Sequence, residues 1–319
     1  MRGIKNENFF RVRPKLHAQG VSLTTPLASL FLARRHASPF TDAMLVSSHL
    51  TILSAFKTKD MSETVIKNFT SGVLKLTLNR PESYNAFNKE MALSLQKSIE
   101  QGAKDDAVRA ILITGKGKAF SSGQDLQEAI DPDGPGLDKI LSEHFNPLVS
   151  QIRETLKPII FAVNGIAAGA GANLALVGDV VVVSEKASFV QAFSKIGLIP
   201  DSGGTYTLPR LVGFAKASAW MMMADKIDSQ EALSSGLVYK VFPEENLLEE
   251  AMSIAKHLAT QPTAAFAGIK KALNSSLFSG LNDQLELERG LQNKMGETQD
   301  FNEGVAAFLE KRRPNFKGK

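Results

Sequence analysis

The 319-residue sequence is 43% hydrophobic and 22% charged, proportions typical of a globular protein, and its length allows one large domain or two smaller ones. It contains no cysteine, which excludes disulfides, thiol catalysis and cysteine-ligated metals. The five histidines form no pair with the spacing of metal ligands, so we expect no metal site.

Basic residues are concentrated near the N-terminus. Residues 1–60 hold nine Lys and Arg against three Asp and Glu, whereas residues 61–319 hold 28 against 30. The pI of about 9.1 therefore reflects the first 60 residues. A near-neutral remainder without a basic run gives no reason to expect a nucleic-acid partner.

Residues 1–60 are rich in Arg, Ser, Thr, Leu and Ala. This composition is typical of organellar transit peptides, and it fits equally an extension ahead of a start at Met61 or a disordered segment. We exclude this segment from the fold and expect one domain over residues 61–319. The expected location is the bacterial cytoplasm, or an organelle if residues 1–60 are a transit peptide.

Residues 159–183 form a long, almost uncharged run that has to be weighed as a membrane span. Asn164, Asn173, Asp179 and four glycines interrupt this run. Such residues suit turns and a packed helix better than lipid, so we expect a buried core segment and no membrane contact.

The periodicity of apolar residues predicts strands alternating with helices, followed by a helical tail. Strands are expected at residues 65–69, 72–78, 108–114, 158–163 and 237–241. Helices are expected at residues 89–102, 137–156, 214–224, 229–236, 244–260, 263–274, 281–295 and 298–312, and from about Gly169. Asn88 has the character of an N-cap, and Asp131 to Gly136 form a surface loop. This order predicts an α/β fold with a buried sheet and a tail apolar enough to pack on a neighbour.

Residues 163–204 hold the features that point to chemistry. Gly169 and Gly171 flank Ala170 at the start of a small-residue helix, where the first N–H groups lack intrahelical partners and no bulky side chain shields them. Ile199-Pro-Asp-Ser-Gly-Gly204 places Asp201 on a tight turn. Free N–H donors together with one carboxylate suit the formation of an enolate.

Four motifs, in this order, resemble those of the crotonase (enoyl-CoA hydratase/isomerase) superfamily. They are Asn79-Arg-Pro81 with Asn85-Ala-Phe87, Ala119-Phe-Ser-Ser-Gly-Gln-Asp-Leu126, Val163-Asn-Gly-Ile-Ala-Ala-Gly-Ala-Gly171 and Gly197-Leu-Ile-Pro-Asp-Ser-Gly-Gly-Thr205. The resemblance covers residues 61–319. It implies a spiral of ββα units over about residues 61–255, with a helical trimerisation tail over about 256–319. Homotrimers or dimers of trimers are implied as well.

The resemblance also implies an oxyanion hole, made by the backbone N–H groups of Gln124 and Ala170. The alternative from the residues alone is a glycine-rich crossover packed closely against a strand. Hydratases of the family use two glutamates, and the matching positions here are Asn173 and Phe193. An amide and a phenyl ring cannot activate water or deliver a proton. We expect Phe193 to line the substrate pocket, unless it is an ordinary core residue. Asn173 is expected to orient substrate or to bond within its helix.

Asp201 is then the remaining candidate for proton transfer. The matching position carries the working aspartate in several isomerases that resemble this chain, whereas an N-cap for the following helix is the alternative. We expect partial burial beside Phe193 and Leu198 to raise its pKa. Asp125 and Leu126 are expected at the pocket, with Asp125 fixing its loop by accepting backbone N–H bonds. Candidate CoA contacts are Ser83, Asn85, Ala86 and Lys270, although Lys270 also fits a solvated basic face.

Further segments resemble the isomerases that act on ring-1,2-epoxyphenylacetyl-CoA in phenylacetate degradation. They include His144-Phe-Asn-Pro-Leu148, Leu208-Pro-Arg-Leu-Val-Gly213 and Leu258-Ala-Thr-Gln-Pro-Thr263. The expected function is isomerisation of such an epoxide to the oxepin form, with a Δ3-to-Δ2 enoyl-CoA shift as a second activity. CoA enters as part of the substrate and no cofactor is expected. The alternatives are a fatty enoyl-CoA isomerase or hydratase, and a non-catalytic binding subunit.

Overall fold

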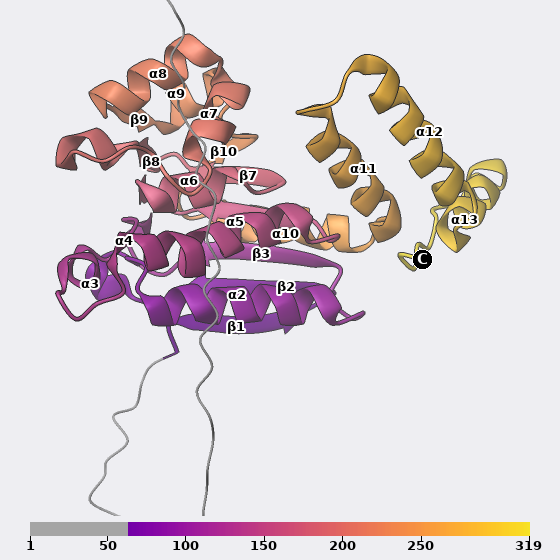
Figure 1. The fold of residues 1–319 in the computed structure, drawn as a ribbon. Helices are drawn as coiled ribbons and strands as arrows, with labels where there is room; N and C mark the ends of the chain where they lie inside the picture. The colour runs from indigo at the N-terminus through magenta and orange to yellow at the C-terminus, as the bar shows by residue number, and fades with distance from the viewer. Residues whose placement is uncertain (1–62) are drawn as a thin grey trace, which may run out of the picture. The chain divides into compact units, whose positions relative to one another are not determined.

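The computed structural model describes residues 63–319 (Figure 1). The predictions for residues 1–60 lie outside the described residues. The domain opens with the antiparallel hairpin of β1 (Val65–Thr70) and β2 (Val73–Leu78), as predicted. Ser71 and Gly72 form its turn with positive φ angles of 50° and 77°. Glycine tolerates this conformation because it has no Cβ.

Helix α2 (Lys89–Lys104) confirms both its predicted position and its predicted N-cap. The Asn88 side chain accepts a hydrogen bond from the Met91 N–H at 3.0 Å. This bond satisfies one of the N–H groups that have no intrahelical partner. Met91, Leu95 and Ile99 recur every four residues and are all fully buried.

The strands form two sheets. The six-stranded sheet has the order β1-β2-β3-β5-β7-β10 and the four-stranded sheet the order β4-β6-β8-β9. The strands not yet given are β3 (Ala110–Gly115), β4 (Ala119–Ser121), β5 (Ile159–Val163), β6 (Ile166–Ala168), β7 (Val180–Ser184), β8 (Ser188–Val190), β9 (Lys226–Asp228) and β10 (Lys240–Phe242). From β3 to β8 the chain alternates between the sheets, adding one parallel strand to each per turn. This alternation is the predicted crotonase spiral.

The central strands of the six-stranded sheet, β3, β5 and β7, are buried on both faces. Alternate residues along β3 point to opposite sides. Ala110 and Leu112 belong to a core shared with α10 (Leu247–Ala259), whereas Ile111 and Ile113 belong to the larger core on the other face. A strand buried on both sides explains why residues 110–113 are all apolar.

Three features differ from the prediction. First, residues 137–156 are not one helix but α4 (Gly136–Lys139), a π-helical turn (Ile140–Phe145) and α5 (Asn146–Glu154). Pro147 follows the π-helical turn and has no N–H to continue a hydrogen-bond ladder. Second, β4, β6, β7, β8 and β9 were not predicted. Four of these strands have three residues, too few to show an alternating pattern, and β7 lies at the end of the continuous apolar run 159–183. Third, α3 (Leu126–Ile130) and α7 (Gly204–Val212) were not predicted.

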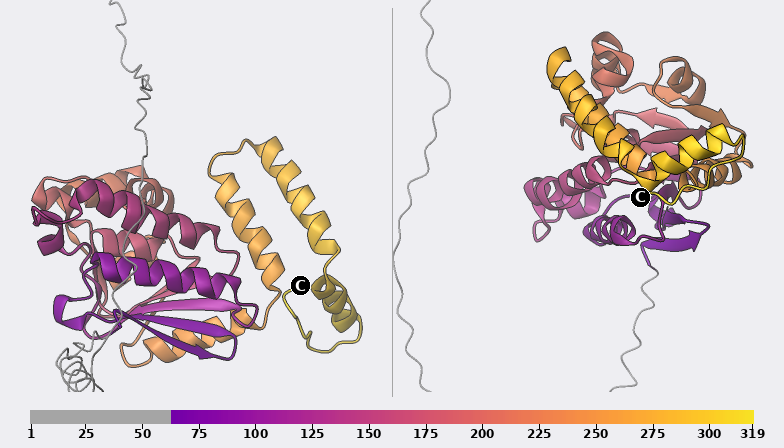
Figure 2. Two further views of the ribbon diagram at one scale, coloured as in Figure 1. Left: turned by 60° about the horizontal axis from the view of Figure 1, so that its bottom comes forward. Right: turned by 90° about the vertical axis from the view of Figure 1, so that its right-hand side faces the viewer.

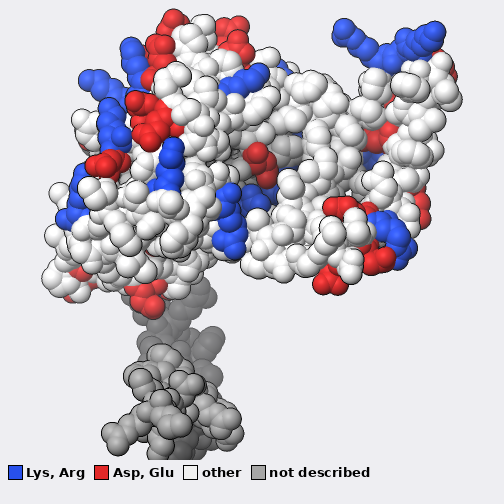
Figure 3. All heavy atoms as spheres, turned by 90° about the horizontal axis from the view of Figure 1, so that it is seen from above, with Lys and Arg blue, Asp and Glu red and all other residues white. Residues whose placement is uncertain are grey.

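The remaining helices follow the predicted order. They are α6 (Ala170–Leu176), α8 (Phe214–Met223), α9 (Ser229–Ser234), α11 (Thr263–Ser276), α12 (Leu281–Gly296) and α13 (Gln299–Leu309). In the tail, α11 and α12 run side by side and are joined at one end (Figure 2). Over residues 63–319, no helix has both the length and the apolar character to cross a membrane. The apolar run 159–183 is instead β5, β6, α6 and most of β7. On the face seen in Figure 3, basic and acidic side chains are interspersed.

Candidate functional site

The four-stranded sheet places the predicted site segments next to one another. Its parallel strands β4, β6 and β8 are neighbours, so their carboxyl ends lie at the same edge of the sheet. The loop with Gln124 follows β4, the helix that begins at Ala170 follows β6, and Phe193 follows β8. Ligands commonly bind at the carboxyl ends of parallel strands.

Glycines allow the first two of these segments to meet closely. Gly123 has φ +98°, and a Cβ built there would lie 2.9 Å from the Ala168 carbonyl oxygen and 3.4 Å from the Ala170 nitrogen. A Cβ on Gly171 would lie 2.6 Å from Ser121 Oγ. Any larger residue at either position would force the two segments apart. The predicted close crossover is therefore present.

The N–H groups of Gln124 and Ala170 remain available at this contact. Phe87 N–H donates to the Gly123 carbonyl at 2.7 Å, and Asp125 N–H donates to the Phe87 carbonyl at 2.8 Å. In such a parallel bridge the residue between, Gln124, directs its own N–H away from Phe87. Within residues 63–319, neither Gln124 N–H nor Ala170 N–H donates a hydrogen bond to the protein.

Phe193 lies beside the same helix start. Its side chain is buried, and its ring Cζ is 3.7 Å from the position that a Cβ on Gly169 would occupy. Gly169 has φ +52° with ψ −128° and donates its N–H to the Val190 carbonyl at 2.9 Å. The phenyl ring therefore forms an apolar wall beside Gly169, the residue before Ala170.

Asp201 lies on a turn before α7 and is not its N-cap. That position belongs to Gly203, which makes no side-chain capping bond, so the N-cap alternative is wrong. The Asp201 carboxylate accepts a hydrogen bond from Ser202 Oγ at 2.8 Å. Burial raises the pKa of Asp201 above its ordinary value, and the Ser202 hydrogen bond partly opposes this rise. The direction agrees with the prediction.

Asn173 differs from its predicted role at the pocket. Its Nδ2 donates to the Asp201 carbonyl oxygen at 2.8 Å, and its Oδ1 accepts from Gln191 Nε2 at 2.8 Å. Both side chains are about 1% exposed. Because both ends of the amide are engaged inside the protein, Asn173 supports the Asp201 turn. A Cβ on Gly204 would lie 2.2 Å from Asn173 Nδ2. Only a glycine at this position therefore allows α7 to begin so close to Asn173.

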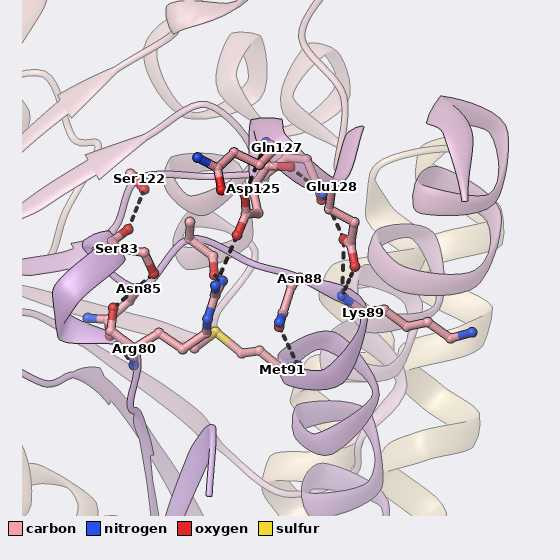
Figure 4. A network of polar contacts seen from close by, with 12 residues as sticks. Arg80, Ser83, Asn85, Asn88, Lys89, Met91, Ser122, Asp125, Gln127 and Glu128 are labelled. Carbon is pink, nitrogen blue, oxygen red and sulfur yellow. Dashed lines mark hydrogen bonds and ion pairs between the residues drawn. The ribbon is translucent and has the colours of Figure 1, made fainter. Parts of the chain in front are cut away.

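The loop after β4 is braced by charged residues, as Figure 4 shows. Asp125 Oδ1 accepts the Gln127 N–H at 3.1 Å, which agrees with its predicted role, and Oδ2 pairs with Arg80 Nη2 at 3.0 Å. Glu128 accepts the Lys89 N–H with both carboxylate oxygens. Leu126, the first residue of α3, is exposed beside this loop.

Arg80 and Glu128 were missed by the sequence analysis. Arg80 lies inside the Asn79-Arg-Pro motif, which was used only as one of the four motifs of the family resemblance. Its partner Asp125 is 45 residues away in the sequence, so no local pattern links them. Glu128 lies in α3, which was not predicted, so the sequence did not indicate its bond with Gln124 at 3.1 Å.

Three predicted CoA contacts form the turn that holds Arg80. Asn85 is fully buried; its Nδ2 donates to two backbone carbonyls, those of Lys116 and Ala119, and its Oδ1 accepts from Arg80 N–H. This corrects the prediction for Asn85, whose side chain has no free donor or acceptor to offer CoA. Ser83 Oγ donates to the Arg80 carbonyl at 3.2 Å, and the Ala86 carbonyl accepts from Arg80 Nη1 at 2.5 Å.

Lys270 also requires a correction, because it is neither on a solvated face nor free for a phosphate. Its Nζ donates to the Ile152 carbonyl at 2.6 Å and to Asp179 Oδ2 at 2.7 Å, and the side chain is buried. Burial lowers the pKa of Lys270, and the charge of Asp179 opposes this change. Lys270 therefore fastens α11 to the body of the domain.

The comparison with known proteins identifies the class. Residues 68–319 match the family described as enoyl-CoA hydratase/isomerase. The chain belongs to this family, that of the crotonases, and is an enzyme of that class. A crystal structure of an enoyl-CoA hydratase from Polaromonas sp. JS666 matches with a TM-score of 0.74 and 34% identity, covering 79% of this chain and 99% of that one.

Two relatives are more similar in sequence to the chain than this structure is. The chain is 46% identical over 262 residues to the 1,2-epoxyphenylacetyl-CoA isomerase of Escherichia coli, covering 81% of this chain and 100% of that protein. It is 45% identical over 256 residues to the "Probable enoyl-CoA hydratase" of Rhodobacter capsulatus, with 80% and 98% covered. One name is that of an isomerase and the other that of a hydratase.

Proposed function

We propose that the chain is an acyl-CoA isomerase that uses two backbone N–H groups and one carboxylate, Asp201. The observation that carries the proposal is the meeting of Gln124 and Ala170 at the carboxyl ends of β4 and β6, with their N–H groups free. Such a pair can hold the thioester oxygen as negative charge develops on it. One well-placed donor of this kind contributes about 10²–10³ in rate.

The acid–base groups favour isomerisation over hydration. Hydration needs one group to activate water and another to deliver a proton, whereas a double-bond shift needs one base that accepts and returns a proton. Phe193 cannot transfer protons, and the Asn173 amide is engaged with Gln191 and Asp201. The raised pKa of Asp201 brings its carboxylate closer to that of a useful base.

The double-bond shift is balanced without any further reactant. With a 3-enoyl thioester, the Asp201 carboxylate removes a proton from the carbon next to the carbonyl, and the negative charge moves to the thioester oxygen. Gln124 and Ala170 N–H hydrogen bonds stabilise this enolate. Asp201 then returns the proton to the distal carbon, leaving the 2-enoyl thioester. The sequence of steps uses only groups of the protein, and CoA enters as part of the substrate.

We propose a ring-1,2-epoxide of phenylacetyl-CoA, rearranged to the oxepin form, as the principal substrate. The identity of 46% to the isomerase of this name supports the proposal. The Phe193 ring beside Gly169 supplies an aromatic wall next to the reacting thioester, and Leu126 an exposed apolar side chain near the loop. A hydratase is the second candidate, because a relative of 45% identity carries that name.

A small panel of thioesters tests these proposals directly. Purified protein is mixed with a 3-enoyl-CoA, crotonyl-CoA and the ring epoxide of phenylacetyl-CoA, and each product is separated by chromatography. We expect fast isomerisation of the epoxide and the 3-enoyl thioester, and little hydration of crotonyl-CoA. Hydration as fast as isomerisation would favour the hydratase. Binding without turnover of any thioester would favour a non-catalytic binding subunit.

The tail supports a further proposal, assembly into homotrimers or dimers of trimers. A groove of about 1000 Å³ lies between α11, α12 and α13 and is lined mainly by apolar residues. Phe308 is 83% exposed near the end of α13, and Phe214 is 82% exposed at the start of α8. Exposed apolar surface of this kind marks contact sites. Light scattering after size exclusion should give the mass of three or six chains.

A further inference from the structure

We infer that Arg80 is a positioning residue, which acts through Asp125 to hold the Gln124 N–H in place for the thioester oxygen. The inference rests on the proposed function, since it assigns a purpose to that N–H. Arg80 does not contact the proposed position of the oxygen. It acts through the loop that carries the donor.

The guanidinium of Arg80 bonds to two segments, the one that ends in Phe87 and the loop that carries Gln124. Nη1 donates to the Ala86 carbonyl at 2.5 Å, and Nη2 pairs with Asp125 Oδ2 at 3.0 Å (Figure 4). Ala86 directly precedes Phe87, and Asp125 directly follows Gln124. The bridge between Phe87 and Gln124 is therefore clamped at its edge by one side chain that bonds to both of its segments.

The backbone of Arg80 is itself held by Asn85. Its N–H donates to Asn85 Oδ1 at 2.9 Å, and its carbonyl accepts the Asn85 N–H at 2.8 Å. Asn85 is fully buried and bonded to the carbonyls of Lys116 and of Ala119, the first residue of β4. The Arg80 backbone is thus anchored at the start of β4, and the loop with Gln124 is the part that its side chain restrains.

The Arg80–Asp125 ion pair is partly buried. The Arg80 and Asp125 side chains are 19% and 18% exposed, whereas those of Lys186 and Glu244, an ion pair elsewhere in the domain, are 67% and 53% exposed. Exposed pairs contribute little to stability or geometry. Because Asp125 lies next to the donor residue, movement of its carboxylate towards solvent would move the Gln124 N–H as well.

Loss of the Arg80–Asp125 pair would reduce the preorganisation of the Gln124 N–H. A hydrogen-bond donor must already face the position that the oxyanion will occupy, within about 0.5 Å, to stabilise charge effectively. Without the clamp the loop would still bind the thioester, but its donor would be misplaced in the transition state. Loss of an interaction made mainly in the transition state lowers kcat and leaves KM nearly unchanged.

The test compares Arg80→Met and Arg80→Lys in the full chain with a control variant, Lys186→Met, which breaks the exposed pair. We expect Arg80→Met to lower kcat for a 3-enoyl thioester by about 10-fold or more, with KM changed less than about threefold. Arg80→Lys should recover part of kcat, because an ammonium can bond to one of the two acceptors. Lys186→Met should behave as the parent. Parental kcat in Arg80→Met would overturn the inference.

A second measurement separates positioning from both folding and the identity of the reaction. The infrared stretch of a carbonyl-labelled acyl-CoA reports polarisation of the bound thioester whether or not turnover occurs. We expect a shift to lower frequency in the parent and a smaller shift in Arg80→Lys and Arg80→Met. A full shift in both variants would overturn the inference. A parent that shows the shift but isomerises nothing would contradict the proposed function alone.

Discussion

Asn173 Nδ2 donates to the backbone carbonyl of Asp201 at 2.8 Å, so the helix that begins at the oxyanion-hole candidate Ala170 also fixes the turn of the candidate base. The position where hydratases of the family are expected to have a glutamate therefore serves here as a support for Asp201. Gln191 holds the other end of the amide, which prevents it from rotating.

This bond leads to a prediction for Asn173→Ala. Two buried groups, the Asp201 carbonyl and the Gln191 amide, would each lose a partner. We expect a loss of about 1–3 kcal/mol in the free energy of unfolding, measured by urea titration. Turnover should fall as well, since the Asp201 turn would no longer be fixed. A stable variant with full activity would show that the bond has no role at the site.

Asp201→Asn separates proton transfer from structure. Because Asp201 is not the N-cap of α7, an amide there should cost no capping bond. Its folded pKa is raised above the unfolded value, so the ionised carboxylate costs stability at neutral pH, and that cost disappears as the pH falls through the folded pKa. The Asn variant should thus be at least as stable as the parent at pH 7. Turnover should fall by about 10² or more.

The control for this variant is binding of a saturated acyl-CoA, measured by calorimetry. Asp201→Asn should bind it as the parent does, because the carboxylate acts on the reacting carbon and not on the CoA group. Parental turnover by a well-folded Asp201→Asn protein would contradict the proposed mechanism.

The sequence predicted the site better than the sheet that assembles it. The glycine motifs, with the family they resemble, indicated Gln124, Ala170 and Asp201, and the hydrophobic pattern predicted β1, β2, β3, β5 and α2. The strands β6 and β8 could not be predicted, because three residues show no periodicity, and β7 was hidden in a continuous apolar run. Pairs of residues far apart in the sequence could not be predicted for another reason. Arg80 with Asp125, and Lys270 with Asp179, meet only after the chain has folded.

The hydroxyl of Ser202 provides a test of pH dependence. As a base, Asp201 must be ionised, so kcat/KM should fall as the pH drops through its pKa. The Ser202 hydrogen bond lowers that pKa, and its removal should raise it. In both Ser202→Gly and Ser202→Ala, we expect the acidic limb of the pH profile to move to higher pH. Because Ser202 has φ +50°, glycine adds no backbone strain there, and a shift shared by both variants would come from the lost hydroxyl. If the acidic limb stays at the parental pH in both variants, the Ser202 hydroxyl does not affect the pKa of the base.

Gly123→Ala tests the close contact between the two candidate donor segments. The added Cβ would lie 2.9 Å from the Ala168 carbonyl oxygen in a backbone conformation, φ +98°, that alanine rarely adopts. Strain of this kind costs about 1–3 kcal/mol. We expect lower stability and a marked loss of turnover. Gly290→Ala is the matched control: a Cβ there meets nothing within 4 Å, and alanine in a helix is favoured by up to about 1 kcal/mol. Equal activity of the two variants would mean that the segments tolerate separation.

Lys270→Met tests how the tail is fastened to the body of the domain. The change removes the donor to the Ile152 carbonyl and leaves Asp179 without its cation, although Asp179 still accepts the Ile159 N–H at 2.8 Å. Breaking a buried ion pair costs about 3–5 kcal/mol, and the 20% exposure of the Asp179 side chain argues for the lower end of that range. Lys271→Met, at the exposed neighbouring position, should cost almost nothing. Guanidinium titration of both variants gives the comparison. If the two lose the same small amount of stability, the Lys270–Asp179 pair does not hold α11 in place.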